Sequence, residues 1–409
     1  GSEMCIRDSA YLMEENTMTM QALVMAHACY GHNSFFKNNY LFRTWTDASS
    51  IIDYLVFAKQ YLSHCEEKYG ISEVEDMLDS CHALMNYGVD RYKRPQKISM
   101  DEEQKRQKDR EAYLQSQVNQ LWKTIPNKDD LSAEHEYRFP SEPQENILYF
   151  IEKNAPLLKP WQREIVRIVR KISQYFYPQK QTQVMNEGWA TFWHYTILQH
   201  LYQENLVTDK FILEVLHNHT NVVFQPEYHS KYYSGINPYA LGFAMFTDLR
   251  RICEHPTAED KEWFPDIAGS DWLETLHFAM QNFKDESFIS QYLSPKVIRD
   301  FHLFAITDDD RESTLEVSAI HNAEGYQQIR QTLSAQYNLS TIEPNIQVYS
   351  ADITGDRSLT LRFVPNQRIP LADNFQQVLK HVHRLWGFNV QLEQLNEDGS
   401  VKLLGSCPL

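Results

Sequence analysis

Two separate stretches of the chain carry side chains that could bind a transition metal. The first, Met-Ala-His-Ala-Cys-Tyr-Gly-His-Asn, holds His27 and His32, and the second, Met-Asn-Glu-Gly-Trp-Ala-Thr-Phe-Trp-His, holds Glu187 and His194. Two imidazoles and a carboxylate form a ligand set that suits Zn²⁺, Fe²⁺ or Mn²⁺. We therefore predict that His27, His32 and Glu187 converge on one divalent metal ion, with zinc as the expected ion.

The spacing of these residues sets conditions on such a site. Five residues apart on a continuous α-helix, His27 and His32 would diverge by roughly 140°. We expect Gly31 to end the first helix in a left-handed conformation, which would free His32 to turn toward His27. On the second helix, His194 lies two turns, about 10 Å, beyond Glu187. We therefore expect His194 behind the ligands or in the pocket lining rather than on the same ion.

Several other polar and aromatic residues are predicted to stand behind the ligands or to line the pocket. They are His82, His219, Trp189, Asn186 and Tyr233. The competing interpretation is structural, because a single histidine on an aromatic-rich helix is more often a hydrogen-bonded core residue than a ligand. For the whole set, a buried polar network without metal and a catalytic or binding site without metal are both open alternatives.

Composition argues against several classes of protein. The 409 residues include 39 Lys and Arg against 55 Asp and Glu, which gives a formal net charge of −16. This acidic balance disfavours a dedicated nucleic-acid binder or a binder of anionic membranes, because both need basic faces. No apolar run approaches the length of a membrane span. Six scattered cysteines without a Cys-x-x-Cys pair and the lack of a signal peptide predict a cytoplasmic location.

Hydrophobic periodicity predicts helices up to about residue 300. Apolar residues recur there at intervals of three and four, with capping residues before the runs and glycines after several of them. The predicted helices are Ala48–Tyr69, Ser72–Tyr87, Glu145–Asn154, Pro160–Phe176, Thr182–Glu204, Thr208–His219, Tyr239–Cys253, Trp272–Asn282 and Asp285–Tyr292. A charged, Gln-rich stretch over Asp101–Gln120 is predicted to be a solvated helix.

Beyond about residue 300 the pattern alternates, which is typical of strands. The predicted strands are Leu303–Thr307, Thr314–His321, Asn345–Ala351, Leu359–Val364 and Val390–Leu395, with helices at Gly325–Tyr337 and Leu371–Trp386. The expected fold class is therefore α+β. We expect a non-native or truncated start over residues 1–9, a mainly helical domain over residues 10–300, and a small α+β domain over residues 301–409.

Four motifs carry a resemblance to a known family. They are His27-Ala28-Cys29-Tyr30-Gly31-His32-Asn33 with Phe35-Phe36-Lys37-Asn38-Asn39-Tyr40, then Asp90-Arg91-Tyr92-Lys93-Arg94-Pro95, Asn186-Glu187-Gly188-Trp189-Ala190-Thr191-Phe192-Trp193-His194, and Ser234-Gly235-Ile236-Asn237-Pro238-Tyr239-Ala240-Leu241-Gly242. These resemble the stage V sporulation protein R family, SpoVR, over nearly the whole chain from Ala10. The resemblance implies a link to the spore cortex, a peptidoglycan layer, and implies as partners a PrkA-type serine kinase and a von Willebrand A-type protein. It implies no established reaction.

One of these motifs has a second likeness. Asn186-Glu187-Gly188-Trp189-Ala190 is similar to the Asn-Glu-Gly-Phe-Ala segment that supplies the third zinc ligand in gluzincin metallopeptidases. Those enzymes carry a His-Glu-x-x-His helix, whereas the interval from His27 to His32 is one residue longer and lacks the glutamate that acts as general base. Glu14, Glu15 or another residue would have to replace that base.

Two functions are therefore predicted as alternatives. The first is a metal-dependent hydrolase-like scaffold linked to cell-envelope or spore-cortex formation. The second is a non-enzymatic partner protein in a serine-kinase-associated stress or sporulation complex. Bound metal would favour the first, and a fully hydrogen-bonded histidine cluster without metal would favour the second.

Overall fold

The structure is a computed structural model that describes residues 12–46, 50–91, 138–307, 316–319, 322–339, 343–365, 371, 374–396 and 398–408. Contacts group the chain into two compact units. Unit 1 comprises residues 1–76, 171–345 and 365–371, and unit 2 comprises residues 77–170, 346–364 and 372–409. Each unit therefore combines parts of the chain that are far apart in the sequence. The predicted solvated helix over Asp101–Gln120 lies outside the described residues.

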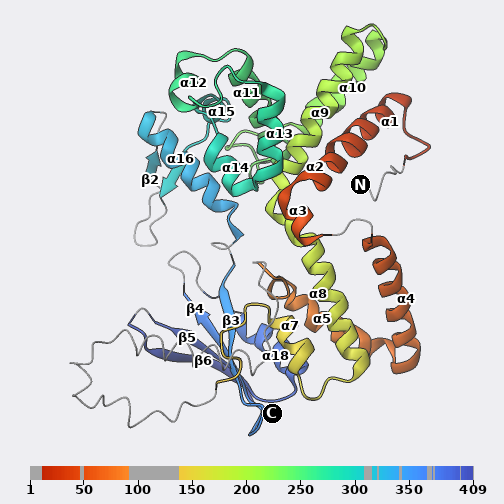
Figure 1. Cartoon of the computed structure of the whole chain (residues 1–409), viewed down its shortest axis with the longest axis vertical. Coiled ribbons are helices and arrows are strands. Elements are labelled where there is room, and N and C mark those ends of the chain that lie inside the picture. The colour runs from red at the N-terminus through yellow and green to blue at the C-terminus, as the bar shows by residue number, and fades with distance from the viewer. Residues whose placement is uncertain are drawn as a thin grey trace, which may run out of the picture. The chain divides into compact units, whose positions relative to one another are not determined.

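Unit 1 is mainly helical (Figure 1). Its elements are α1 (Met18–Val24), the π-helix η1 (Met25–His32), α2 (Asn33–Asn38), α3 (Tyr40–Trp45), α4 (Ile51–Tyr69), α9 (Gln183–Gln203), α10 (Asp209–Val222), α11 (Pro238–Glu254), α12 (Ala258–Trp263), α13 (Trp272–Asn282), α14 (Asp285–Tyr292), α15 (Pro295–Asp300) and α16 (Ala323–Gln336), with an antiparallel pair of strands β1 (Ala305–Thr307) and β2 (Glu316–Ala319). Helices α5 (Ile71–Ala83) and α8 (Pro160–Gln181) each contribute residues to both units.

Helix α9 lies at the centre of unit 1. Nearly every side chain between Val184 and His194 is buried, so this part of the helix has no polar face. A helix that is apolar on all sides is stable only when other elements surround it. Here η1, α10, α11 and α14 do so (Figure 1). The large cluster of buried side chains in this unit includes Trp189 and Phe192 of α9.

Glycines allow the backbones around α9 to approach closely. A Cβ atom added at Gly188 would lie 2.4 Å from the Cα of Gly242 on α11, and one added at Gly31 would lie 2.5 Å from the Cα of Ala190. Such distances leave no room for a side chain, so glycine is required by packing at these positions. The prediction that Gly31 ends its helix in a left-handed conformation is wrong, because Gly31 lies inside η1 and its hydrogen atom faces α9.

The start of α9 is held by a buried carboxylate from α14. Asp285 accepts hydrogen bonds of 2.8 Å from the backbone N–H groups of Val184 and Met185. These groups belong to the first turn, where helical N–H groups have no partner within the helix. Burial nevertheless raises the pKa of Asp285 to about 7, while the backbone hydrogen bonds act in the opposite direction.

Unit 2 is built around a four-stranded sheet of order β3-β4-β5-β6. Its elements are η2 (Met85–Tyr87), α7 (Ile147–Asn154), β3 (Asn345–Ala351), β4 (Leu359–Val364), α18 (Phe375–Trp386), β5 (Val390–Leu395) and β6 (Val401–Cys407). Strands β4 and β5 are parallel and α18 connects them, as a parallel pair requires a crossover, whereas β5 and β6 are antiparallel. The buried Trp386 of α18 stacks on Phe150 of α7 at a ring distance of 5.8 Å.

This division of the chain differs from the boundary expected at residue 300. Helix α16 packs against α14, where Arg330 donates to the carbonyl of Leu293 and Ser334 to that of Glu286, so β1, β2 and α16 belong with the helical unit. Conversely, α7 supplies Phe150 to the core beside the sheet. The change in hydrophobic periodicity near residue 300 therefore marks where strands begin. It does not coincide with the boundary between the two units.

Most predicted helices and strands have their counterparts in the structure, and the α+β fold class is confirmed. The helices Trp272–Asn282 and Asp285–Tyr292 have the predicted bounds, and Thr17 accepts a hydrogen bond from Met20 as the cap of α1. Strand β6 was not predicted. Among the described residues, no helix combines the length and the apolar character that a membrane crossing needs.

Candidate metal centre

The side chains of His27, His32 and Glu187 meet where η1 packs against α9. The Nε2 atoms of His27 and His32 lie 3.9 Å and 3.5 Å from Oε2 of Glu187. One ligand atom from each residue can be chosen so that all three lie within 4.8 Å of one another. The structure therefore brings together the three residues that were predicted as ligands, although 155 positions separate His32 from Glu187.

The π-helix explains how the two histidines share a face. In a π-helix the backbone hydrogen bonds join residues i and i+5, so residues five apart lie about one turn apart. His27 and His32 have this spacing within η1, and their ring centroids are 4.7 Å apart with planes at 89°. The interval that is one residue too long for an α-helix thus suits a π-helix, and no break in the helix is needed.

Glu187 presents a carboxylate oxygen that its surroundings do not satisfy. Its Oε2 atom is buried and accepts no hydrogen bond within the described chain. Burial and, as a smaller cause, the neighbouring His32 together lower the pKa of His27 to about 3, so His27 is neutral near pH 7. A neutral His27 offers Glu187 no positive charge. A buried carboxylate oxygen without a donor is costly, and a bound cation would remove that cost.

The hydrogen bond of His32 leaves its other ring nitrogen available as a ligand. Its Nδ1 atom lies 2.9 Å from Oδ1 of Asn186, an oxygen that can only accept, so Nδ1 carries the hydrogen. In the neutral form of the ring, Nε2 of His32 then carries a lone pair, and this atom lies 3.5 Å from Oε2 of Glu187. A metal-binding histidine ordinarily donates its second ring N–H to a nearby acceptor in this way.

His27 is backed by two further histidines. Its Nδ1 atom lies 3.0 Å from Nδ1 of His194, and Nε2 of His194 lies 3.0 Å from Nδ1 of His219 on α10. Burial is the main cause that lowers the pKa of His194 and brings that of His219 to about 4, so these rings are neutral as well. If His27 donates through Nδ1, then His194 must donate through Nε2, and Nε2 of His27 keeps its lone pair for a metal.

Aromatic rings and a short polar chain support this arrangement. Trp189 donates from Nε1 to Oγ of Ser34, which in turn donates to the carbonyl of Gly31 inside η1, at 2.8 Å and 3.0 Å. Phe36 stacks on His32 and Tyr239 lies parallel to His27, at ring distances of 5.9 Å and 6.4 Å. Ser34, Phe36 and Tyr239 were not predicted as site residues, although the motifs that carry the family resemblance contain or adjoin them.

Other predicted residues lie elsewhere. His82 is an exposed residue of α5 in unit 2, whereas the cluster belongs to unit 1. Tyr233 packs against Tyr228, at a ring distance of 5.3 Å. Glu14 and Glu15, considered as replacements for the general base, are exposed ahead of α1, and none of the described contacts joins them to the ligands.

The side chains described above form a cluster of two histidines and one glutamate at a π-helix. Comparison with known protein families shows to which family the chain belongs. The family model described as "SpoVR like protein" matches residues 2–342, and the family model described as "SpoVR-like C-terminal domain" matches residues 344–397. The chain belongs to the SpoVR family.

A relative from Escherichia coli (strain K12), described as uncharacterized protein YcgB, is similar along the whole chain. It is 73% identical over 409 residues, which are 100% of this chain and 80% of the relative. No solved structure matches the chain. These comparisons establish the family of the chain.

Proposed function

We propose that this SpoVR-family protein binds a divalent transition metal, zinc first, through Nε2 of His27, Nε2 of His32 and the carboxylate of Glu187. The observation that carries the proposal is the buried Oε2 atom of Glu187, which accepts no hydrogen bond within the described chain while two ring nitrogens face it. The donor set fits zinc, because catalytic zinc sites commonly combine three such protein ligands.

The proposed activity is metal-dependent hydrolysis of a cell-envelope component, with the peptidoglycan of the spore cortex as the expected substrate class. Zinc bound by three protein ligands would leave one position for water and would lower the pKa of that water to about 7. Asn186 and His194 would hold the two imidazoles in the orientation that keeps both Nε2 lone pairs free. The buried aromatic side chains of α9 would limit the access of bulk water.

Metal analysis of protein purified without chelators or a His-tag tests the proposal. We expect about one zinc ion per wild-type chain and little metal in Glu187→Gln, which keeps the volume but loses the anionic charge. Glu204→Gln, a matched change at the end of the same helix, should keep its metal. In thermal unfolding, Glu187→Gln should match EDTA-treated wild type and should not respond to EDTA.

A second measurement tests the activity. Purified peptidoglycan incubated with metal-loaded wild type should release soluble fragments detectable by mass spectrometry, and Glu187→Gln should release none. Wild type without stoichiometric metal and without a response to EDTA would contradict the metal site. The alternative, a partner protein that docks in a complex with a PrkA-type serine kinase and a von Willebrand A-type protein, would then be preferred.

A further inference from the structure

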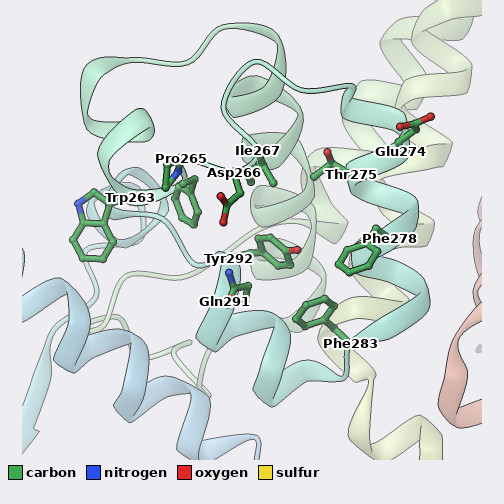
Figure 2. Close-up of a pocket in the computed structure, with 11 residues that line it drawn as sticks. Trp263, Pro265, Asp266, Ile267, Glu274, Thr275, Phe278, Phe283, Gln291 and Tyr292 are labelled. Carbon is green, nitrogen blue, oxygen red and sulfur yellow. The ribbon is translucent and has the colours of Figure 1, made fainter.

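A pocket in the helical unit lies apart from the metal-centre residues in the sequence. Its volume is about 450 Å³, within the range of ligand-binding sites, and all its lining residues fall between Trp263 and Tyr292 (Figure 2). They come from the end of α12, the loop that follows it, α13 and α14. None of them belongs to the histidine cluster, so ligand binding in this pocket does not depend on the proposed metal-dependent function.

Aromatic rings form much of the wall. The five aromatic residues of the lining are Trp263, Phe264, Phe278, Phe283 and Tyr292. Phe264 and Tyr292 are almost fully buried, so they form a fixed floor, whereas Phe278 is 56% exposed at the edge. Such a set offers both apolar surface and the negative faces of several π systems to a ligand.

The charged groups of the lining are all acidic. Asp266 and Glu274 are the two ionisable lining side chains besides Tyr292, and the lining holds no lysine, arginine or histidine. Figure 2 shows the Asp266 carboxylate and the Gln291 amide directed toward the same space beside the Tyr292 ring. Within the described chain, no hydrogen bond or ion pair engages the carboxylate of Asp266. The pocket therefore has an acceptor ready for a positively charged group.

The loop that carries Asp266 is held in place by its neighbours. Backbone N–H groups of Ile267 and Ala268 donate to the carbonyl of Phe264, and that of Gly269 donates to Ile252 of α11. Ser270 adds hydrogen bonds from its hydroxyl to the carbonyl of Ile267 and with the hydroxyl of Thr275. These hydrogen bonds fix the backbone of the loop, so binding at the pocket needs little ordering of the main chain.

One cation does lie against the same rings. The guanidinium of Arg330 is 4.9 Å from the centroid of Trp263 and 5.5 Å from that of Phe264. It donates two hydrogen bonds to the carbonyl of Leu293 and does not line the pocket. These contacts show that the rings accept a cation, and within the described chain Arg330 forms no ion pair with Asp266, which is an exposed residue.

We propose that this pocket binds a small organic cation with a methylated ammonium group. Aromatic faces together with a carboxylate are the combination that recognises such cations, because the diffuse charge is attracted by the rings and loses little hydration. The pocket is larger than a trimethylammonium group alone, so the natural ligand would carry a further polar or apolar part, which Gln291 and the edge near Phe278 can contact.

Binding of two probes of equal shape tests the charge requirement. Choline carries a trimethylammonium group, and 3,3-dimethylbutan-1-ol is its neutral carbon analogue. In calorimetry and ligand-observed NMR on the full chain, we expect choline to bind at least about fivefold more tightly than the neutral alcohol. Equal binding of both probes, or no binding of choline, would overturn the proposal.

Three variants assign the effect to this pocket. Asp266→Asn should weaken choline binding by about tenfold, and Phe278→Leu should weaken it by a smaller factor because the edge ring is lost. Glu262→Gln removes an exposed charge on α12 outside the lining and should leave binding unchanged. An unaffected Asp266→Asn, or an equal loss in Glu262→Gln, would show that general electrostatic attraction is responsible and would contradict the proposal.

Discussion

The histidine cluster and the aromatic pocket belong to the same unit but are built in opposite ways. The cluster joins segments 155 positions apart, and its buried ring nitrogens are engaged by Asn186, His194 and His219. The pocket comes from 30 consecutive residues, Trp263 to Tyr292, and leaves Asp266 facing open space. The cluster should therefore depend on how helices pack, whereas the pocket should depend on local side chains.

Among the residues that contact both regions, Asp285 is fully buried. Asp285 begins α14, a helix that lines the pocket, and its carboxylate accepts hydrogen bonds from the first turn of α9, the helix that carries Glu187. A change at Asp285 should therefore affect both regions, whereas changes within either region should affect that region alone.

The largest effect is expected from Gly31→Ala. The new methyl group would lie 2.5 Å from the Cα of Ala190 and would push η1 away from α9. We expect a loss of about 3 kcal/mol in the free energy of unfolding and loss of metal binding, with choline binding kept in the protein that remains folded. Cys29→Ala, an exposed position of the same π-helix, is the control and should be neutral. Unchanged metal content in Gly31→Ala would show that the cluster tolerates a shift of η1.

A pair of substitutions at His194 separates hydrogen bonding from packing. His194→Asn keeps an acceptor near the position of Nδ1, so His27 can still donate, whereas His194→Leu removes the acceptor at similar volume. We expect zinc affinity to fall by about 10–100-fold in His194→Leu and by much less in His194→Asn. Chelator competition measures the affinity, and unfolding of the metal-free proteins measures stability. Equal zinc affinities in both variants would show that the hydrogen bond from His27 to His194 does not affect zinc binding and that His194 acts through packing alone.

Asp285 allows a test by pH. Its folded pKa, raised to about 7 by burial, exceeds the unfolded value of 3.8, so its contribution is present at low pH and is lost as the pH rises through 7. The stability of wild type relative to Asp285→Asn should therefore fall by about 2 kcal/mol between pH 5 and pH 8. The buried histidines contribute the opposite trend equally to both proteins, so it cancels in the difference. A constant difference across this range would contradict the raised pKa.

The smallest effect on stability is expected from Phe278→Leu. Because Phe278 is largely exposed at the edge of the pocket, the substitution should change the free energy of unfolding by less than about 0.5 kcal/mol. Metal content should not change. Urea unfolding and elemental analysis measure both quantities, and a loss of metal would show that the two regions are coupled through α13.

The sequence predicts the helices and the three ligand candidates because these depend on local patterns and residue chemistry. The bounds of α13 and α14 follow from their caps and apolar spacing. The π-helix could not be predicted in this way, because its conformation goes with the contact between Gly31 and Ala190, which are far apart in the sequence. For the same reason the sequence near α9 does not predict that Asp285, about a hundred positions away, accepts hydrogen bonds from its first turn.

The division into units escaped prediction for a related reason. Periodicity shows which residues form a strand but not which distant helix covers the sheet, and α7 precedes its sheet by nearly two hundred residues. Strand β6 has no buried residue, so its hydrophobic alternation is weak.

The row of His27, His194 and His219 can hold its hydrogens in only two orders, each the reverse of the other. In one order, Nε2 of His27 is a bare lone pair and Nε2 of His219 carries a hydrogen; in the other, His27 points a hydrogen at Glu187 and His219 donates inward through Nδ1. A metal ion on His27 is compatible with the first order alone. In the proposed metal-bound state, Nε2 of His219 on α10 would therefore carry a hydrogen, a consequence that needs no movement of the backbone.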